Sequence, residues 1–194
     1  MNWKKTAAGI LALCICMTPV ATHGKAFPGI SLSASAAETT SLTYTDDSVG
    51  TITYHIDNAG IQIEQLVFTG TTLQIPAEID GTPVNSIGSF ALSKCTALES
   101  LTLPDSITSI SFQAFSNLEN LTAVTLPDSI RSIGNSAFSG CTALTEVRLP
   151  KNLRAVEDYL FARCTSLKNV TLPEQPDYLG ALAFSNTALE SIDI

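Results

Sequence analysis

Hydrophobic residues in the second half of the chain recur every 23 residues. Leu-Pro pairs, a Phe and several Leu, Ile or Val residues all keep this spacing. The columns are Leu103, Leu126, Leu149 and Leu172, each followed by Pro; Phe115, Phe138, Phe161 and Phe184; Leu98, Leu121, Leu144 and Leu167; Leu101, Val124, Val147 and Val170; and Ile110, Ile133 and Val156. Because independent columns share one period, the chain contains an internal structural repeat.

Each repeat predicts a short strand followed by a return segment. The segments SLTL, AVTL, EVRL and NVTL place alternate residues on opposite sides, as a strand with one buried face does. The Pro that follows has no N–H and predicts the end of the strand. We expect the next segment to turn the chain back and to bury its Phe beneath the sheet. One repeat cannot bury its own apolar face, so the pattern predicts stacked coils with a parallel sheet.

The combined motif I-G-x-x-A-F-x-x-C-x-x-L in LPDSIRSIGNSAFSGCTALTEVRLP resembles the BspA-like (TpLRR) class of bacterial leucine-rich repeats. The resemblance covers about residues 75–194. It implies an α/β repeat fold, a leucine-rich-repeat solenoid with a 23-residue period and a parallel β-sheet face. The sequence departs from the motif where Leu118 replaces the Cys and Leu160 the Ala, and one residue is lost near FSNTAL. Five extra residues between Ile75 and Ile87 predict a small hairpin with Gly81 in its turn.

The two ends of the repeat region differ in pattern. Residues 42–73 alternate apolar and polar positions, which predicts two or three antiparallel strands. We interpret residues 38–74 as an N-terminal β cap and residues 75–194 as the repeats, since an exposed terminal coil needs a cover. At the other end Leu189, Ile192 and Ile194 continue the strand pattern to the last residue. We therefore expect the chain to continue beyond Ile194; the alternative is an uncapped coil.

Residues 1–37 resemble a secretory signal peptide. Lys4 and Lys5 precede an apolar run from Ala7 to Val20, which is shorter than the roughly 20 residues needed to span a bilayer. The segment SASAAE predicts cleavage after Ala36 or Ala37. Cleavage near Ala21 and a retained membrane anchor remain alternatives. We expect no membrane span after signal removal.

The composition excludes several classes of protein. Hydrophobic residues make up 45% and charged residues 14%, which is incompatible with disorder. Removal of residues 1–37 leaves 7 basic and 18 acidic residues, a formal charge of −11. An acidic surface repels phosphates, so we expect neither nucleic acid nor anionic membranes as partners. The remaining length suits roughly one domain.

Candidate chemistry is sparse outside the signal peptide. His55 is the one histidine there, and no nucleophile, P-loop, dinucleotide or HExxH motif occurs. Asp46, Asp47, Asp57 and Asn58 do not have the spacing of an EF-hand loop, and we interpret them as solvated turn residues. We therefore expect no catalytic residue, no metal site and no cofactor.

Three cysteines, Cys95, Cys141 and Cys164, fall in one column of the stack because their separations are 46 and 23 residues. Adjacent coils about 4.8 Å apart bring Cα atoms within disulfide range. Equivalent side chains point the same way, however, which leaves their Cβ atoms farther apart than a disulfide prefers. The column also accepts Leu118. We expect buried free thiols rather than disulfides or zinc ligands.

The outward face of the sheet is the candidate binding surface. Two columns are predicted to point to solvent: Ser100, Ala123, Glu146, Asn169 and Ser191; and Thr102, Thr125, Arg148, Thr171 and Asp193. The candidate binding residues are Ser100, Thr102, Thr125, Glu146, Arg148, Asn169 and Thr171, with Arg148 beside Glu146 as the distinctive spot. We expect a gently curved platform without a pocket. It is either a solvated face with Thr chosen for strand propensity or a shallow binding surface.

These observations predict a secreted or cell-surface binding module without catalysis in this region. The resemblance implies such a role, because members of the family are bacterial surface proteins associated with adhesion and aggregation. The expected partner is a protein or a glycan-bearing host or matrix surface. Two alternatives stay open: the targeting module of a longer secreted enzyme whose sequence is truncated at Ile194, and a structural protein that self-associates through an uncapped C-terminal coil.

Overall fold

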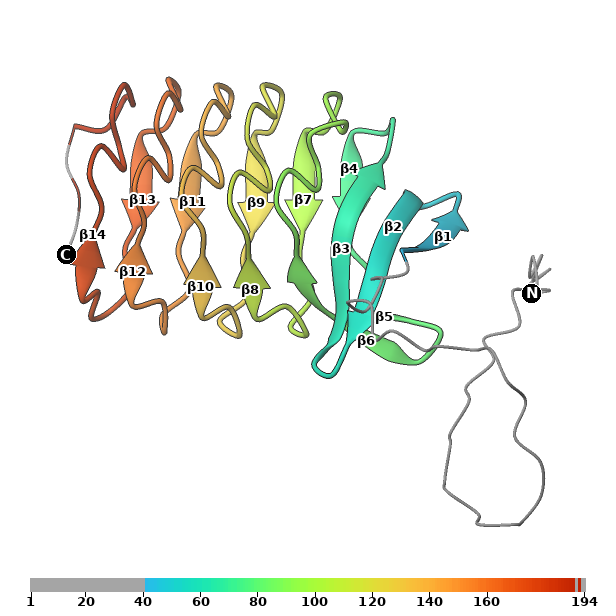
Figure 1. Cartoon of the computed structure of the whole chain (residues 1–194). Coiled ribbons are helices and arrows are strands. Elements are labelled where there is room, and N and C mark those ends of the chain that lie inside the picture. Colours follow the sequence, from blue (N-terminus) through green and yellow to red (C-terminus); the bar gives the residue numbers. More distant parts are fainter. Residues whose placement is uncertain (1–40, 191, 193–194) are drawn as a thin grey trace, which may run out of the picture. The chain divides into compact units, whose positions relative to one another are not determined.

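The computed structural model describes residues 41–190 and residue 192, and every regular element in this part of the chain is a β-strand (Figure 1). The predicted signal peptide, residues 1–37, lies outside the described residues. The prediction of an α/β fold is wrong for the described residues, which form a β-solenoid without helices. Each return segment carries a residue with φ between 51° and 58°, a left-handed conformation that a right-handed helix cannot contain. These residues are Phe90, Gln113, Ser136, Tyr159 and Leu182.

The N-terminal part is an antiparallel sheet of three strands, as the alternating pattern predicted. It comprises β1 (Leu42–Asp46), β2 (Gly50–Asp57) and β3 (Gly60–Val67). Its inward residues, among them Ile52, Ile61 and Leu66, are fully buried. Strand β3 also pairs in parallel with β6 (Thr82–Ile87), which connects this sheet to the coils.

The predicted hairpin with Gly81 in its turn is confirmed. Strand β5 (Glu78–Ile79) pairs antiparallel with β6. Asp80 and Gly81 between them have φ values of 50° and 78°. Two successive positive φ values suit the tight turns that join antiparallel strands, and Asp-Gly supplies them at low cost.

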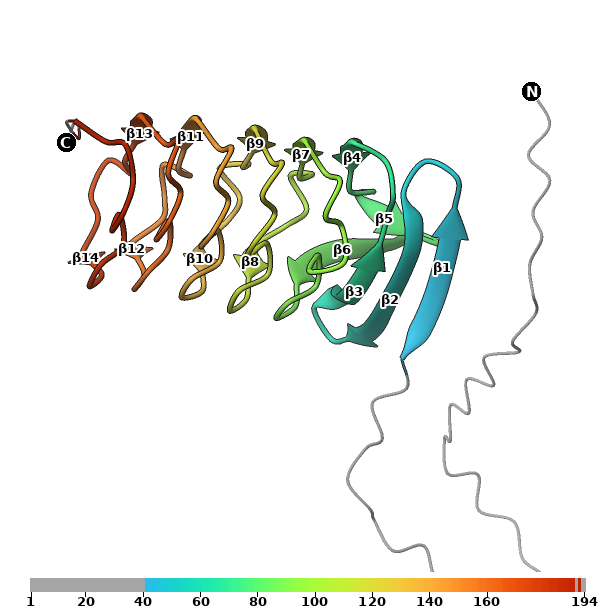
Figure 2. The same ribbon diagram turned by 90° about the horizontal axis from the view of Figure 1, so that it is seen from above.

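The coils place their strands in two parallel rows on opposite sides (Figures 1 and 2). The first row holds the strands predicted from the Leu/Val columns: β7 (Ser100–Thr102), β9 (Ala123–Thr125), β11 (Glu146–Arg148) and β13 (Asn169–Thr171). It begins with β4 (Thr72–Gln74), which was expected among the antiparallel strands but pairs in parallel with β7. After β6, the second row holds β8 (Ser109–Ile110), β10 (Ser132–Ile133), β12 (Ala155–Val156) and β14 (Tyr178–Leu179). Within each ladder of repeats the register is one period, since Leu101 pairs with Val124 and Val147 with Val170.

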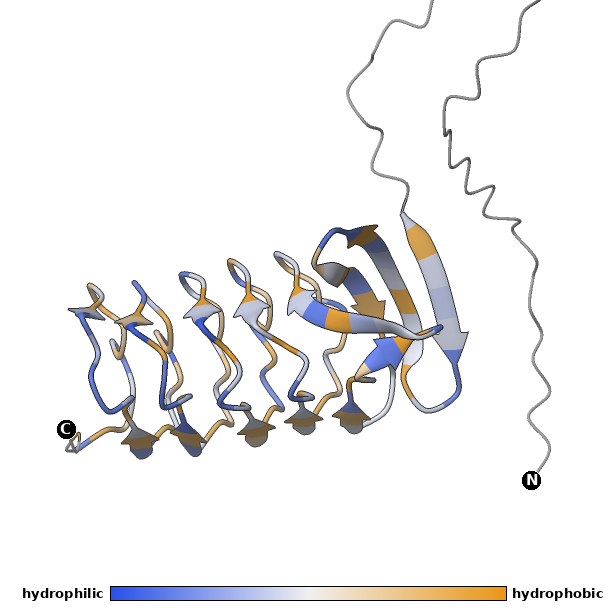
Figure 3. Cartoon of the chain, turned by 90° about the horizontal axis from the view of Figure 1, so that it is seen from below, coloured by the Kyte–Doolittle hydropathy of each residue, from blue (hydrophilic) through white to orange (hydrophobic). Residues whose placement is uncertain are grey.

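The core runs through the coils between the two rows, and hydrophobic and polar residues alternate along every coil (Figure 3). Phe115, Phe138 and Phe161 are fully buried and stack on one another. Their ring centroids are 5.0 Å and 5.4 Å apart, and Phe184 continues the stack at 5.8 Å. The predicted burial of this column is confirmed, and Leu92 takes the same place in the preceding coil.

Both rows of strands are interrupted at the same step. Strand β7 pairs with β9 and β11 with β13, but β9 and β11 form no ladder; likewise β8 pairs with β10 and β12 with β14. The N–H groups of Leu103 and Leu149 donate to the carbonyls of Thr125 and Thr171 in the next coil. The described residues contain no equivalent bond from the Leu126 N–H to the Arg148 carbonyl. We call the coils that contain β4, β7 and β9 the N-terminal block, and those that contain β11 and β13 the C-terminal block.

The return segments stay bonded across this boundary. Ser136, Phe138 and Gly140 donate their N–H groups to the carbonyls of Asp158, Leu160 and Ala162 at 2.8–3.0 Å. The stacked Phe138 and Phe161 rings cross the boundary as well. The two blocks therefore remain one stack, joined along the return segments and opened along both rows of strands.

Candidate functional site

The structure places the predicted binding residues on the outward face of the first row of strands. Ser100 and Thr102 lie on β7 and are half-buried. Thr125 on β9, Glu146 and Arg148 on β11, and Asn169 and Thr171 on β13 are all exposed. The residues between them point inward: Leu101, Val147 and Val170 are at most 6% exposed, while Val124 is half-buried. The predicted alternation of the strands is thus confirmed.

This face is not flat at the boundary between the blocks. An open hollow of about 640 Å³ lies over β9 and β11, where the ladder is interrupted. We call it the sheet-face hollow, and it is lined by Thr122, Ala123, Val124, Thr125, Leu126, Thr145, Glu146, Val147, Arg148, Asn169 and Thr171. The expectation of a platform without a pocket is wrong, because coils that are not joined by a ladder leave space between their strands. Ser100 and Thr102 lie outside the hollow.

Arg148 forms an ion pair with Asp128 across the block boundary. Its Nη2 donates to both carboxylate oxygens of Asp128, at 2.8 Å and 3.0 Å. The backbone N–H of Lys151 donates to Asp128 Oδ1 at 3.0 Å. The sequence had drawn attention to Glu146 beside Arg148, but the described residues contain no ion pair between those two. Arg148 is therefore held in place by the preceding coil rather than by its own strand.

Asp128 is the functional candidate that the sequence analysis missed. The Lys151 N–H and then the Arg148 guanidinium lower the pKa of its carboxyl below the ordinary value of 3.8. Asp128 lies 20 residues before Arg148, so the contact cannot be seen within one repeat. Repeat spacing offered a signal, because Asp128 lies one period before Lys151, three residues from Arg148.

The other polar candidates have local roles. Asp46 Oδ1 accepts the Ser48 N–H, and Asp57 Oδ1 accepts the N–H groups of Ala59 and Gly60, which confirms them as turn residues. His55 Nδ1 lies 3.1 Å from Glu64 Oε1 on the neighbouring strand. Within residues 41–190, no group of three or more His, Cys, Asp or Glu side chains is arranged to hold a metal ion. No helix in this part of the chain is long and apolar enough to cross a membrane.

The three cysteines are buried free thiols, as predicted. Each Sγ donates to a backbone carbonyl, that of Leu66, Phe115 or Phe138, at 3.1–3.4 Å. Burial raises the pKa of Cys95 to about 11 and that of Cys164 to about 12, and it also raises that of Cys141. These thiols stay protonated at neutral pH and act as packing groups.

The repeats match a known protein family over most of the repeat region. Residues 85–194 match the family model described as the BspA type leucine rich repeat region, in 6 copies. No curated protein matches the chain.

Three solved structures share the fold. The Treponema pallidum leucine-rich repeat protein TpLRR is 30% identical, with a TM-score of 0.71; the match covers 74% of this chain and 68% of that one. A leucine rich cell surface protein of Faecalibacterium prausnitzii is 27% identical, with a TM-score of 0.58, and the match covers 76% of this chain and 47% of that one. The pneumococcal vaccine antigen PcpA, at 18% identity and a TM-score of 0.59, shares the fold; the match covers 78% of this chain and 49% of that protein.

Proposed function

The chain belongs to the BspA-type leucine-rich repeat family, and we propose that it is a secreted or cell-surface binding module that mediates adhesion to a protein or to a glycan-bearing host or matrix surface. The signal-like residues 1–37 support export. The relative from Faecalibacterium prausnitzii, described as a cell surface protein, supports a place at the cell surface. We propose no catalysis in this region, because the resemblance and the motif search both favour binding over chemistry.

The observation that carries the proposal is the sheet-face hollow with Arg148 at its edge. Repeat solenoids commonly bind partners on such an extended face. The hollow presents hydroxyl groups from Thr122, Thr125 and Thr171 together with one oriented guanidinium. Because Asp128 fixes Arg148 in one position, less conformational entropy is lost when a partner binds. Arg148 and Asp128 are both about half exposed, so either can also contact a partner directly.

A charge reversal in the hollow tests this proposal. Beads coated with the purified protein are applied to a reconstituted extracellular-matrix gel and to cultured epithelial cells. We expect saturable adhesion by the original chain and a loss of about tenfold with Arg148→Glu, because the variant removes the guanidinium and places a second carboxylate beside that of Asp128. Arg163→Glu, an equal change at an exposed return segment, is the matched control and should retain adhesion.

Two outcomes oppose the proposal. Saturable adhesion that Arg148→Glu leaves unchanged excludes the sheet face as the contact surface. Absence of adhesion to both substrates, together with concentration-dependent assembly in sedimentation, supports the self-associating structural role instead. Tyr178 and Leu179 on β14, 46% and 56% exposed, are the apolar residues on which such assembly would depend.

A further inference from the structure

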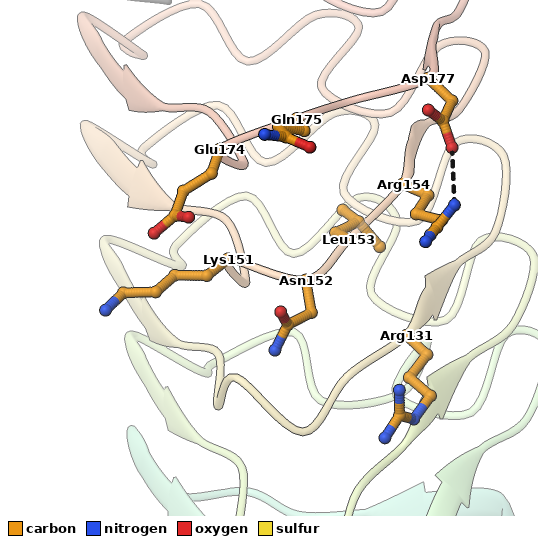
Figure 4. A pocket seen from close by; sticks show the side chains of 8 residues that line it. All are labelled: Arg131, Lys151, Asn152, Leu153, Arg154, Glu174, Gln175 and Asp177. Atoms are coloured by element: carbon orange, nitrogen blue, oxygen red, sulfur yellow. Dashed lines mark hydrogen bonds and ion pairs between the residues drawn. The ribbon is translucent and has the colours of Figure 1, made fainter.

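A second hollow lies on the turns between the two rows of strands, away from the sheet face. It has a volume of about 370 Å³ and spans the same boundary between the blocks (Figure 4). We call it the arginine hollow. Its lining residues are Arg131, Lys151, Asn152, Leu153, Arg154, Glu174, Gln175 and Asp177. Arg131 comes from the N-terminal block, and the others come from the turns of the C-terminal block.

Two arginines occupy the same position in adjacent coils of this hollow. Arg131 and Arg154 are one 23-residue period apart, in a column that holds Asn85 and Thr108 before them and Asp177 after them. Figure 4 shows both guanidinium groups on the same side of the hollow. Each arginine directly precedes a strand of the second row, β10 or β12, and these two strands form no ladder. The column thus places two of the chain's few cations in successive coils, and Asp177 at its next position offers a carboxylate to Arg154.

The backbone opens between these two arginines. Along their column, Thr108 N–H donates to Asn85 O, Arg131 N–H to Thr108 O and Asp177 N–H to Arg154 O, at 2.7–2.8 Å. The described residues lack the equivalent bond from Arg154 N–H to Arg131 O. The two successive arginines and the missing bond thus occur at the same step of the stack.

Neither arginine is fully neutralised by the protein. Arg131 makes no ion pair within residues 41–190. Arg154 Nη1 lies 3.3 Å from Asp177 Oδ2, but the two side chains are 82% and 68% exposed, and such pairs contribute little. Lys151 and Glu174 lie at the other end of the hollow (Figure 4). Most guanidinium N–H donors of the pair are therefore available to a ligand.

We propose that the arginine hollow binds an acidic polysaccharide whose carboxylate or sulfate groups pair with Arg131 and Arg154. Guanidinium groups recognise such planar or tetrahedral oxyanions through paired hydrogen bonds. The amide groups of Asn152 and Gln175 in the lining both donate and accept hydrogen bonds, as sugar hydroxyls require. The lining contains no aromatic residue, and Leu153 is only 1% exposed, so the hollow lacks the apolar anchor on which protein partners rely.

The test uses residues 38–194 and defined oligosaccharides in isothermal titration calorimetry at low ionic strength. Hyaluronan fragments carry carboxylates only, whereas chondroitin sulfate fragments carry carboxylates and sulfates. Binding of both oligosaccharides shows that a carboxylate is sufficient, and binding of chondroitin sulfate alone shows that sulfate is required. The double variant Arg131→Gln/Arg154→Gln should weaken binding roughly tenfold or more. The matched control, Arg163→Gln/Lys168→Gln, removes two exposed cations elsewhere and should stay within about twofold.

A gain of affinity provides a test that misfolding cannot imitate. Asp177→Asn removes the carboxylate that competes for Arg154 and should tighten binding severalfold. Added salt should weaken binding of every variant that retains the site.

The proposal is overturned if neither oligosaccharide binds, or if the control pair loses as much affinity as the arginine pair. It is also overturned if poly-glutamate binds as tightly as the oligosaccharides and with the same response to the variants, because the partner is then an acidic protein.

Discussion

The two blocks of coils share one interior but differ on the outside. Inside, the centroids of Phe138 and Phe161 are 5.4 Å apart across the boundary, and those of Phe115 and Phe138 are 5.0 Å apart within the N-terminal block. Outside, β7 and β9 present Ser, Thr and Ala, whereas β11 presents Glu146 and Arg148. The stack therefore continues where the strand ladders do not. Its continuity depends on the buried columns and on the backbone bonds of the return segments rather than on the strand ladders.

On the outside of the boundary, side-chain hydrogen bonds and an ion pair take the place of a strand ladder. Asp128 in the N-terminal block accepts hydrogen bonds from Arg148 and Lys151 in the C-terminal block. The contacts of one carboxylate hold the coils together less strongly than a row of backbone hydrogen bonds does. Both surface hollows lie at this boundary, where the strand ladder is absent. In this repeat protein, surface hollows occur at a step where the exposed columns change while the buried Phe column continues.

The largest expected effect comes from removing a ring that joins the blocks. Phe138→Ala should lower the free energy of unfolding by about 3–5 kcal/mol, because a fully buried ring is replaced by a cavity between Phe115 and Phe161. Urea denaturation followed by circular dichroism measures it. Phe112→Ala is the control, since that ring is 45% exposed and its removal should cost far less. Equal losses in the two variants contradict the idea that the buried column holds the blocks together.

A smaller effect is expected on the pH dependence of the free energy of unfolding, through the buried thiols on the two sides of the boundary. Burial raises the pKa of Cys95 from 9.0 to about 11, so above pH 9 the unfolded chain loses a proton that the folded chain retains. Stability should therefore fall with rising pH between about 9 and about 11. The original chain should lose about 1 kcal/mol more than Cys95→Ala between pH 8 and pH 10.

Cys164 extends this prediction to the C-terminal block. Burial raises its pKa to about 12, so Cys164→Ala should remove a pH-dependent loss of similar size. Denaturation at several pH values measures both variants. If the C-terminal block opens by itself, Cys164 reacts with a thiol reagent in the native protein while Cys95 does not, and the shared interior is then less uniform than the buried columns indicate.

The smallest expected effect on the free energy of unfolding comes from Asp128, the carboxylate at the block boundary. Asp128→Asn should reduce stability slightly at neutral pH, because the ion pair with Arg148 is exposed. The pKa of Asp128 is lowered in the folded chain, so its contribution is present above about pH 3.8 and is lost as the pH falls through the folded value. Denaturation of both chains at pH 7 and below pH 3.8 measures this; a difference that persists in acid shows that the carboxylate charge is not its cause.

Much of the fold could be predicted from residues that repeat at 23. The Phe column, the inward Leu and Val positions, the buried thiols and the Asp80–Gly81 hairpin follow from spacing and residue type. The α/β assignment failed because the return segments contain left-handed residues such as Gln113 and Ser136, whose φ values no hydrophobic pattern reveals.

The candidate site could be predicted only in part. Alternation along the strands identified which residues face outward, including Arg148. It could not identify Asp128 as its partner, because that contact joins two coils and depends on how closely they stack. The arginine hollow was missed altogether: Arg131 and Arg154 lie one period apart, but no sequence pattern indicates that the backbone bond between their coils is absent.

The period, the buried columns and the outward columns follow from the order of apolar and polar residues, and the net negative charge follows from composition. The step at which the coils separate, and the charges that meet across it, are visible only in the folded chain. Contacts between coils balance packing of the core against electrostatics and hydrogen bonding at the surface. That balance depends on distances between residues about 20 positions apart, which a linear pattern does not contain.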